Sequence, residues 1–204
     1  REPQPREAAL GALRGACKLM LTRQRIRGCA MGLAAYREIV VHLRGMFSRK
    51  KKVTLRDVHR IAKWNGHPIS QAIQMRQAAV EYLQLIRKEF QSEELEHLDK
   101  ATTLYRQVST HLEKLQSILP PAEPSPHDTV PSNSEQRLEL GLGLFRFWGW
   151  MTIDPQLKAQ QSIIKMFKSK CRAAVKVLEQ IVGAETKAIN EIERVLQISE
   201  KLKM

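Results

Sequence analysis

A helical pattern of about fifty residues ends the sequence and constrains its fold more than any other feature. Apolar side chains recur at spacings of three and four from Ile164 to Leu202, which places them on one face of a helix. Asp154 followed by Pro155 is a typical helix start. A second apolar row widens this face, and it consists of Val175, Val182, Ile189 and Leu196. A face wider than a coiled-coil seam needs several partner helices, so we predict an all-α multi-helix bundle with one C-terminal helix of roughly 45–50 residues.

The first 119 residues read as about four shorter helices. Residues 6–47 have helical periodicity, but Gly28 and Gly32 each cost about 1 kcal/mol inside a helix. We therefore expect a break or kink within 22–32. Further helices are expected at 55–64, 69–90 and 92–119, the last capped by Ser92 and followed by glutamates that suit the helix dipole.

A proline-rich stretch divides the chain into two blocks. Residues 120–134 contain five prolines and have no apolar periodicity, which is typical of a linker or a disordered loop. The basic helical block is 1–119, and 135–204 holds an aromatic segment and the long helix. The second block has about 70 residues, a thin core by itself, so we expect it to pack on the first. No membrane span or signal peptide is expected, and because Arg1 stands in place of Met, the sequence can be a piece of a longer chain.

Basic charge is concentrated near the start of the chain. The formal net charge is +13, and residues 1–53 hold 13 lysines and arginines against three acidic residues. A surface of one sign attracts nucleic acid, an acidic protein or an anionic membrane surface, although a solvated face has the same pattern. The candidate anion contacts are Arg14, Lys18, Arg23, Arg25, Arg27, Arg37, Arg44, Arg49, Lys50, Lys51 and Lys52, with Lys165, Lys168, Lys170 and Arg172 further along.

The long C-terminal helix has a reversed charge order. Residues 155–178 contain six basic residues and no acidic one, whereas 179–200 contain five acidic and two basic residues. This order opposes the helix dipole, which prefers acidic residues first. We interpret it either as a match to a neighbouring helix or subunit of opposite charge order, or as a second phosphate-contacting patch.

The segment 138–151 departs from the helical pattern. Four leucines alternate there with period two, as in a strand, and aromatic residues follow. It reads either as a buried connecting helix or as a docking segment for a partner, because aromatic anchors are favoured at interfaces. The candidate docking residues are Leu144, Phe145, Phe147, Trp148 and Trp150.

The sequence offers little support for catalysis. Glu94 and His97 have the spacing of a carboxylate-bridged metal bundle, but the second such pair is missing and neighbouring leucines claim the buried face. We therefore expect both side chains to point mostly outward. Three cysteines lie within apolar helical patterns and are expected to be interior thiols in a reducing compartment. No catalytic residue, metal or cofactor is predicted.

These observations favour a non-catalytic helical adaptor or assembly subunit inside the cell, with the nucleus preferred over the cytoplasm. It would bind protein partners, possible copies of itself included, through helical and aromatic surfaces. Its basic N-terminal block would bind an anionic partner. The alternatives are a protein that binds RNA or DNA directly and, with the least support, a helical-bundle metalloenzyme.

Overall fold

The computed structural model describes residues 4–22, 25–26, 29–46, 53, 57, 61, 67–119 and 153–202, with side chains of the last segment described from Lys165. The helices within these residues are α1 (Pro5–Leu21), α2 (Gly32–Gly45), α4 (His67–Ile86), the short 3-10 helix η1 (Arg87–Glu89), α5 (Ser92–Ile118) and α7 (Ile153–Lys201). Two-residue strands β1 (Arg25–Ile26) and β2 (Cys29–Ala30) form one antiparallel pair. The predicted all-α bundle is confirmed, and α7 has 49 residues.

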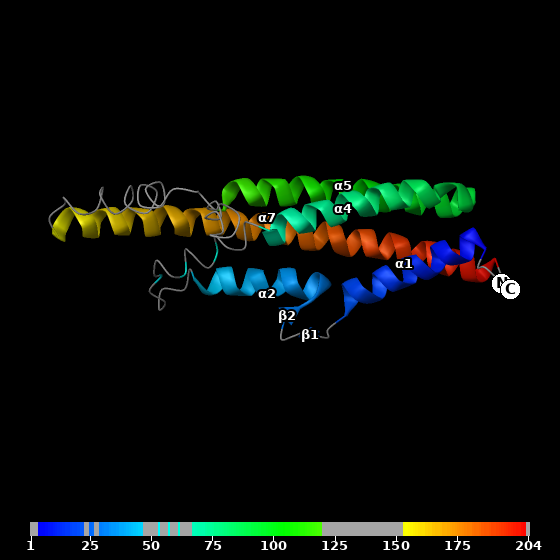
Figure 1. Ribbon diagram of the computed structural model, residues 1–204, viewed down its shortest axis with the longest axis horizontal. Helices are drawn as coiled ribbons and strands as arrows, with labels where there is room; N and C mark the ends of the chain where they lie inside the picture. The colour runs from blue at the N-terminus through cyan, green and yellow to red at the C-terminus, as the bar shows by residue number, and fades with distance from the viewer. Residues whose placement is uncertain are drawn as a thin grey trace, which may run out of the picture.

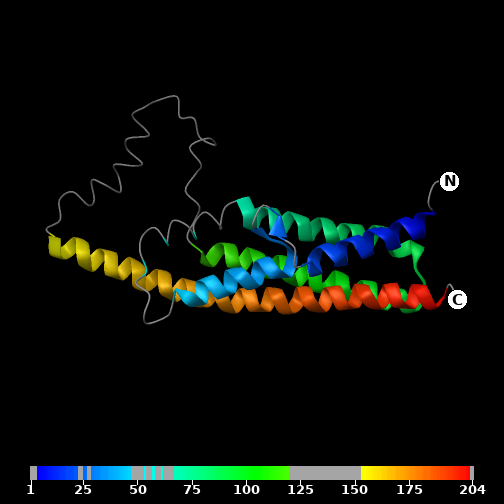
Figure 2. The same ribbon diagram turned by 90° about the horizontal axis from the view of Figure 1, so that it is seen from below.

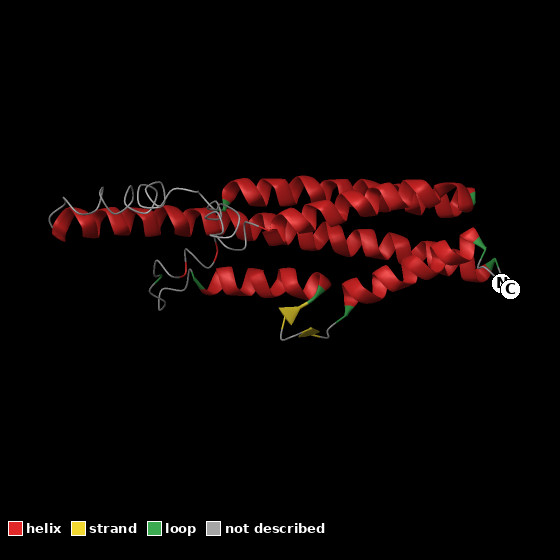
Figure 3. Ribbon diagram, in the orientation of Figure 1, coloured by secondary structure: helices red, strands yellow, loops and turns green. Residues whose placement is uncertain are grey.

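Helix α7 runs along the whole length of the helical bundle (Figure 1). Helices α4 and α5 pack together along one side of it, and α2 and α1 follow one another along another side (Figures 1 and 2). The most extensive contact joins α5 to α7. The first turns of α7 extend past the ends of α2 and α5, while the two chain ends lie together at the opposite end. Figure 3 shows how little of the described chain is not helical.

A turn separates α1 from α2, as the glycines predicted. Gly32 begins α2 with a positive φ of 54°, a conformation that glycine adopts at little cost. A Cβ atom at this position would also overlap the backbone carbonyl of Met20 at the end of α1. The close approach of two backbones and the positive φ therefore both require glycine here.

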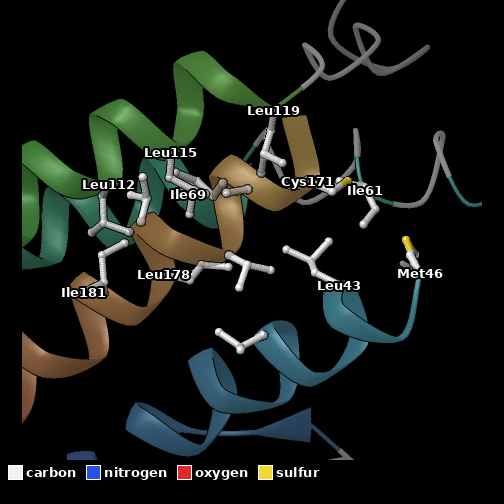
Figure 4. Close-up of a cluster of buried hydrophobic side chains, with 14 of the residues drawn as sticks. Leu43, Met46, Ile61, Ile69, Leu112, Leu115, Leu119, Cys171, Leu178 and Ile181 are labelled. Carbon is white, nitrogen blue, oxygen red and sulfur yellow. The ribbon is translucent and has the colours of Figure 1, made fainter. Parts of the chain in front are cut away.

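Two apolar clusters fill the bundle. The first joins α2, the start of α4, the end of α5 and the first half of α7, with Leu43, Leu112 and Leu178 each about 1% exposed (Figure 4). The second joins α1, the end of α4, the start of α5 and the second half of α7, around residues such as Leu10 and Leu98. Each fully buried leucine contributes roughly 1.5–3 kcal/mol. Because both clusters draw on α5 and α7, the two ends of the bundle are tied to the same pair of helices.

The helix boundaries differ slightly from the predicted ones. The predicted helix 69–90 is α4 followed by η1, and it begins two residues earlier. The prediction that Ser92 caps the next helix was wrong by one residue, because Gln91 is the cap and its backbone N–H donates to Glu94 Oε2 at 2.9 Å. This reciprocal capping geometry places Glu94 three residues after the cap. The predicted linker 120–134 lies outside the described residues, as does most of the predicted helix 55–64. Within the described part of the chain, no helix combines the length and the apolar character that a membrane span requires.

Candidate interaction surface

The acidic half of α7 faces the arginines of α1 and α2. Arg14 of α1 donates to Glu200 at 3.0 Å, and Arg44 of α2 forms an ion pair with Glu179. These two pairs give the acidic half of α7 basic neighbours within the chain itself. Both pairs are exposed, so each contributes at most about 1 kcal/mol. Their effect is to neutralise part of the basic N-terminal block and to favour one alignment of the helices.

The predicted anion contacts fall into three groups. Arg14, Arg25 and Arg44 are engaged in ion pairs, with Arg25 bound to Glu38 at 2.7 Å. Lys18 and Arg37 are exposed and have no carboxylate partner among the described residues. The predicted contacts outside the described residues are Arg23, Arg27, Arg49, Lys50, Lys51 and Lys52.

The remaining predicted contacts gather on the first half of α7. Lys165, Lys168 and Arg172 are three of them, and Lys176, which was not among the predicted contacts, continues the series. The four follow one another at spacings of three, four and four, so they lie along one side of the helix. We call these four residues the basic ridge; Lys168 is half-buried and the other three are exposed. They span about 16 Å at 1.5 Å per residue. The predicted contact Lys170 is half-buried and, two residues from both Lys168 and Arg172, lies on nearly the opposite side of the helix, so it is not part of the ridge.

The basic ridge points away from the bundle. Phe167 and Cys171, in the same turns of α7, are buried in the first apolar cluster. The three lysines of the ridge have no carboxylate partner among the residues that the structure describes. The charge of the three ridge lysines is therefore not neutralised by a described carboxylate, whereas the charges of Arg14 and Arg44 are partly neutralised.

One ion pair is buried in the middle of the bundle. Arg76 of α4 donates from Nε to Glu185 Oε1 of α7, with side chains 10% and 0% exposed. Glu185 Oε2 has no hydrogen-bond partner within the described residues. Burial raises the pKa of Glu185 above its usual value, although Arg76 opposes this shift. Burial alone would lower the pKa of Arg76, but the Glu185 carboxylate outweighs it and raises that pKa.

Sequence reasoning missed this pair, although a signal was present. Arg76 occupies a position in the apolar stripe of α4, between Ile73 and Val80. Glu185 occupies the equivalent kind of position in α7, four residues after Ile181. A charged residue at a core position of each of two helices predicts that the two side chains meet, because an unpaired buried charge is costly.

The expectation that Glu94 points outward was wrong. Its side chain is 0% exposed, Arg6 Nη2 donates to it at 2.6 Å, and Ser199 Oγ donates to the same carboxylate oxygen. Burial would raise the pKa of Glu94, but these hydrogen bonds and the Arg6 charge lower it. His97 is also largely buried and lies 2.6 Å from Glu191 Oε2. Both side chains thus tie the start of α5 to α1 and α7.

The thiols of Cys17 and Cys171 are buried and free. Burial, with a smaller contribution from Glu193, raises the pKa of Cys17 to about 11, and burial raises that of Cys171 to about 12. Neither thiol is ionised to an appreciable extent near neutral pH. Among the described residues, no three His, Cys, Asp or Glu side chains are grouped so as to hold a metal ion.

The predicted docking segment is not part of the described surface, since Leu144, Phe145, Phe147, Trp148 and Trp150 lie outside the described residues. Comparison of the chain with protein-family models, with curated proteins and with solved structures found no match. The candidate interaction surface therefore depends on the geometry of this chain alone.

Proposed function

We propose that this chain is a non-catalytic adaptor that binds an acidic segment of a partner protein along the basic ridge of α7. The observation that supports this most is the contrast between two sets of cations. Arg14 and Arg44 form ion pairs with glutamates in the acidic half of α7. The ridge lysines, by contrast, have no carboxylate partner among the described residues. Lys18 of α1 and Arg37 of α2 also have no carboxylate partner among the described residues, but they lie on different helices, whereas the ridge places three such lysines along one helix. We therefore assign the proposed anionic contact to α7.

A helical acidic partner suits the geometry of the ridge. Cations at spacings of three and four present one charge per helical turn, about 5.4 Å apart. An acidic helix with the same spacing can lie alongside the ridge with one carboxylate facing each lysine. Each exposed pair contributes little, so pairs with the three ridge lysines give a moderate affinity that depends on salt.

Direct binding of nucleic acid is the second candidate. The unpaired lysines of the ridge and the net charge of +13 favour it, because phosphate contacts need long cations and no particular fold. A polynucleotide and an acidic helix differ in their salt dependence. Contacts of the three ridge lysines with phosphates of duplex DNA give a slope of about −2.7 for log K against log salt concentration.

The buried cysteines and glutamates are in states that suit a structural role. The thiols of Cys17 and Cys171 are held in the protonated form by burial. The carboxylates of Glu94 and Glu185 are each occupied by an arginine. These groups contribute to folding in this arrangement, which is consistent with a binding protein.

A charge-matched pair of variants tests the proposal. The ridge variant replaces Lys165, Lys168, Arg172 and Lys176 with Gln. The control variant makes the same substitution at four exposed bases elsewhere, which are Lys18, Arg37, Arg106 and Lys114. Both lose four positive charges, so only the position of the charge differs.

Binding is measured by fluorescence anisotropy with a glutamate-rich helical peptide, a short single-stranded RNA and a short DNA duplex, between about 50 and 200 mM salt. We expect the ridge variant to bind the peptide at least about tenfold more weakly and the control variant to stay within about twofold of the wild type. Equal losses in both variants would overturn the ridge as the site. Tighter binding of RNA or DNA than of the peptide, lost in the ridge variant alone, would favour the second candidate.

A further inference from the structure

An apolar cavity of about 120 Å³ lies between α2, α4, α5 and α7. Its inner wall is formed by Leu43 of α2, Leu112 of α5 and Leu178 of α7, which Figure 4 shows facing one another. Among the ten described lining residues, the phenol of Tyr36 is the only polar side chain. The cavity is partly open rather than fully enclosed, and its described wall is almost entirely apolar.

Water does not suit this cavity. A buried water molecule needs two to four polar partners, and the described wall offers one side chain that can serve. An apolar cavity of about 150 Å³ in another protein stays dry and binds benzene or xenon. The size and the lining of the present cavity therefore match a ligand of the same class.

The cavity can be reached from the surface. Pro68 at the start of α4 is exposed, while Ile39 of α2 and Ala72 of α4 are half-buried. The inner leucines, by contrast, are about 1% exposed. The pocket is therefore partly open, and its wall at α2 and α4 is less buried than its inner wall.

We infer that this cavity is a binding site for a small apolar molecule about the size of one benzene ring. Ligand contact with Leu43, Leu112 and Leu178 would replace van der Waals contacts that the empty space forgoes. Tyr36 supplies an aromatic edge and the one polar group of the described wall. The site is independent of the basic ridge, which lies on the outer side of α7.

The test is a titration of the full chain, labelled at leucine methyl groups, with toluene as the probe. We expect saturable shifts for the methyl resonances of Leu43, Leu112 and Leu178. The methyl groups of Leu10 and Leu98, in the second apolar cluster, should stay unchanged. Shifts that do not saturate, or that are equally large in both clusters, would overturn the site.

A pair of variants sharpens this test. Ala72→Leu adds three carbon atoms at the cavity wall, whereas Ala78→Leu makes the same change at an exposed position of the same helix. We expect toluene to bind at least tenfold more weakly to Ala72→Leu and within twofold of the wild type to Ala78→Leu. Wild-type affinity in a folded Ala72→Leu variant would refute the assignment. If that variant does not fold, the methyl shifts of the wild type still decide the matter.

Discussion

Replacing Arg76 or Glu185 alone should destabilise the bundle far more than replacing both together. Glu185 is fully buried and Arg76 nearly so, and each is the other's charge partner. Removing one member leaves an uncompensated charge in the interior, which costs about 3–5 kcal/mol. Replacing both with apolar residues of similar volume removes the desolvation penalty too, and such exchanges are often neutral or stabilising by about 1–4 kcal/mol.

The assay is urea unfolding of Arg76→Met, Glu185→Leu and the double variant, with circular dichroism as the signal that monitors unfolding. For a chain of this size, a loss of 3–5 kcal/mol lowers the melting temperature by about 6–20 °C. The exposed pair gives the control, since Arg14→Met should cost less than about 1 kcal/mol. A double variant whose loss equals the sum of the two single losses would refute the reasoning. So would single losses no larger than that of Arg14→Met.

Three further outcomes follow from local geometry. Gly32→Ala should lower the free energy of unfolding by about 2–5 kcal/mol, because the alanine would combine a positive φ with a backbone overlap. Gly15→Ala, in open space on α1, should raise the free energy of unfolding by about 1 kcal/mol in the same urea assay. Glu94 has a lowered folded-state pKa, so its stabilisation is present above the usual value of 4.5 and is lost as the pH falls through the folded pKa. Glu94→Gln should therefore unfold more easily at neutral pH but show a smaller loss of stability on acidification; an unchanged acid limb in an unfolding titration would contradict this. In a variant with Cys29 replaced by Ser, Cys17 and Cys171 should react with a disulfide reagent at pH 8 only after urea unfolds the protein. The reason is that fewer than about one of these thiols in a thousand is ionised in the folded state. Rapid reaction of the native protein would count against their burial.

The helical architecture was predictable because it depends on spacing alone. Most of the buried positions of α5 and α7 are apolar and recur at three and four, and one face of each helix is buried as a result. The turn between α1 and α2 was predictable from Gly32, whose backbone conformation other residues adopt at a cost. These features are local, so the sequence contains them directly.

The partners of charged residues were harder to predict because they depend on which helices become neighbours. Glu94 was expected to face solvent, since Leu95 and Leu98 accounted for the buried face of its own helix. Arg6 and Ser199, which bind it, come from opposite ends of the chain. Their approach follows from the packing of α1 and α7 around the start of α5, and spacing within one helix says nothing about it.

The candidate interaction surface was predictable in part. The cations of the first half of α7 were identified from their density, and their 3-4-4 spacing places the ridge on one side of the helix. The loss of charge at Arg14 and Arg44 was not predictable, because Glu200 and Glu179 are separated from them by more than a hundred residues. The three lysines of the ridge have no carboxylate partner among the described residues, and this follows from the packing of the helices rather than from spacing within one helix.

The central claim is that the basic ridge binds an anionic partner, and lysine footprinting tests it most directly. Lysines are acetylated with and without the bound acidic peptide, and the modified positions are quantified by mass spectrometry. Our account predicts that Lys165, Lys168 and Lys176 become protected while the exposed Lys18 and Lys114 react as before. Protection of Lys18 or of Lys50–Lys52, with the ridge lysines unchanged, would contradict it.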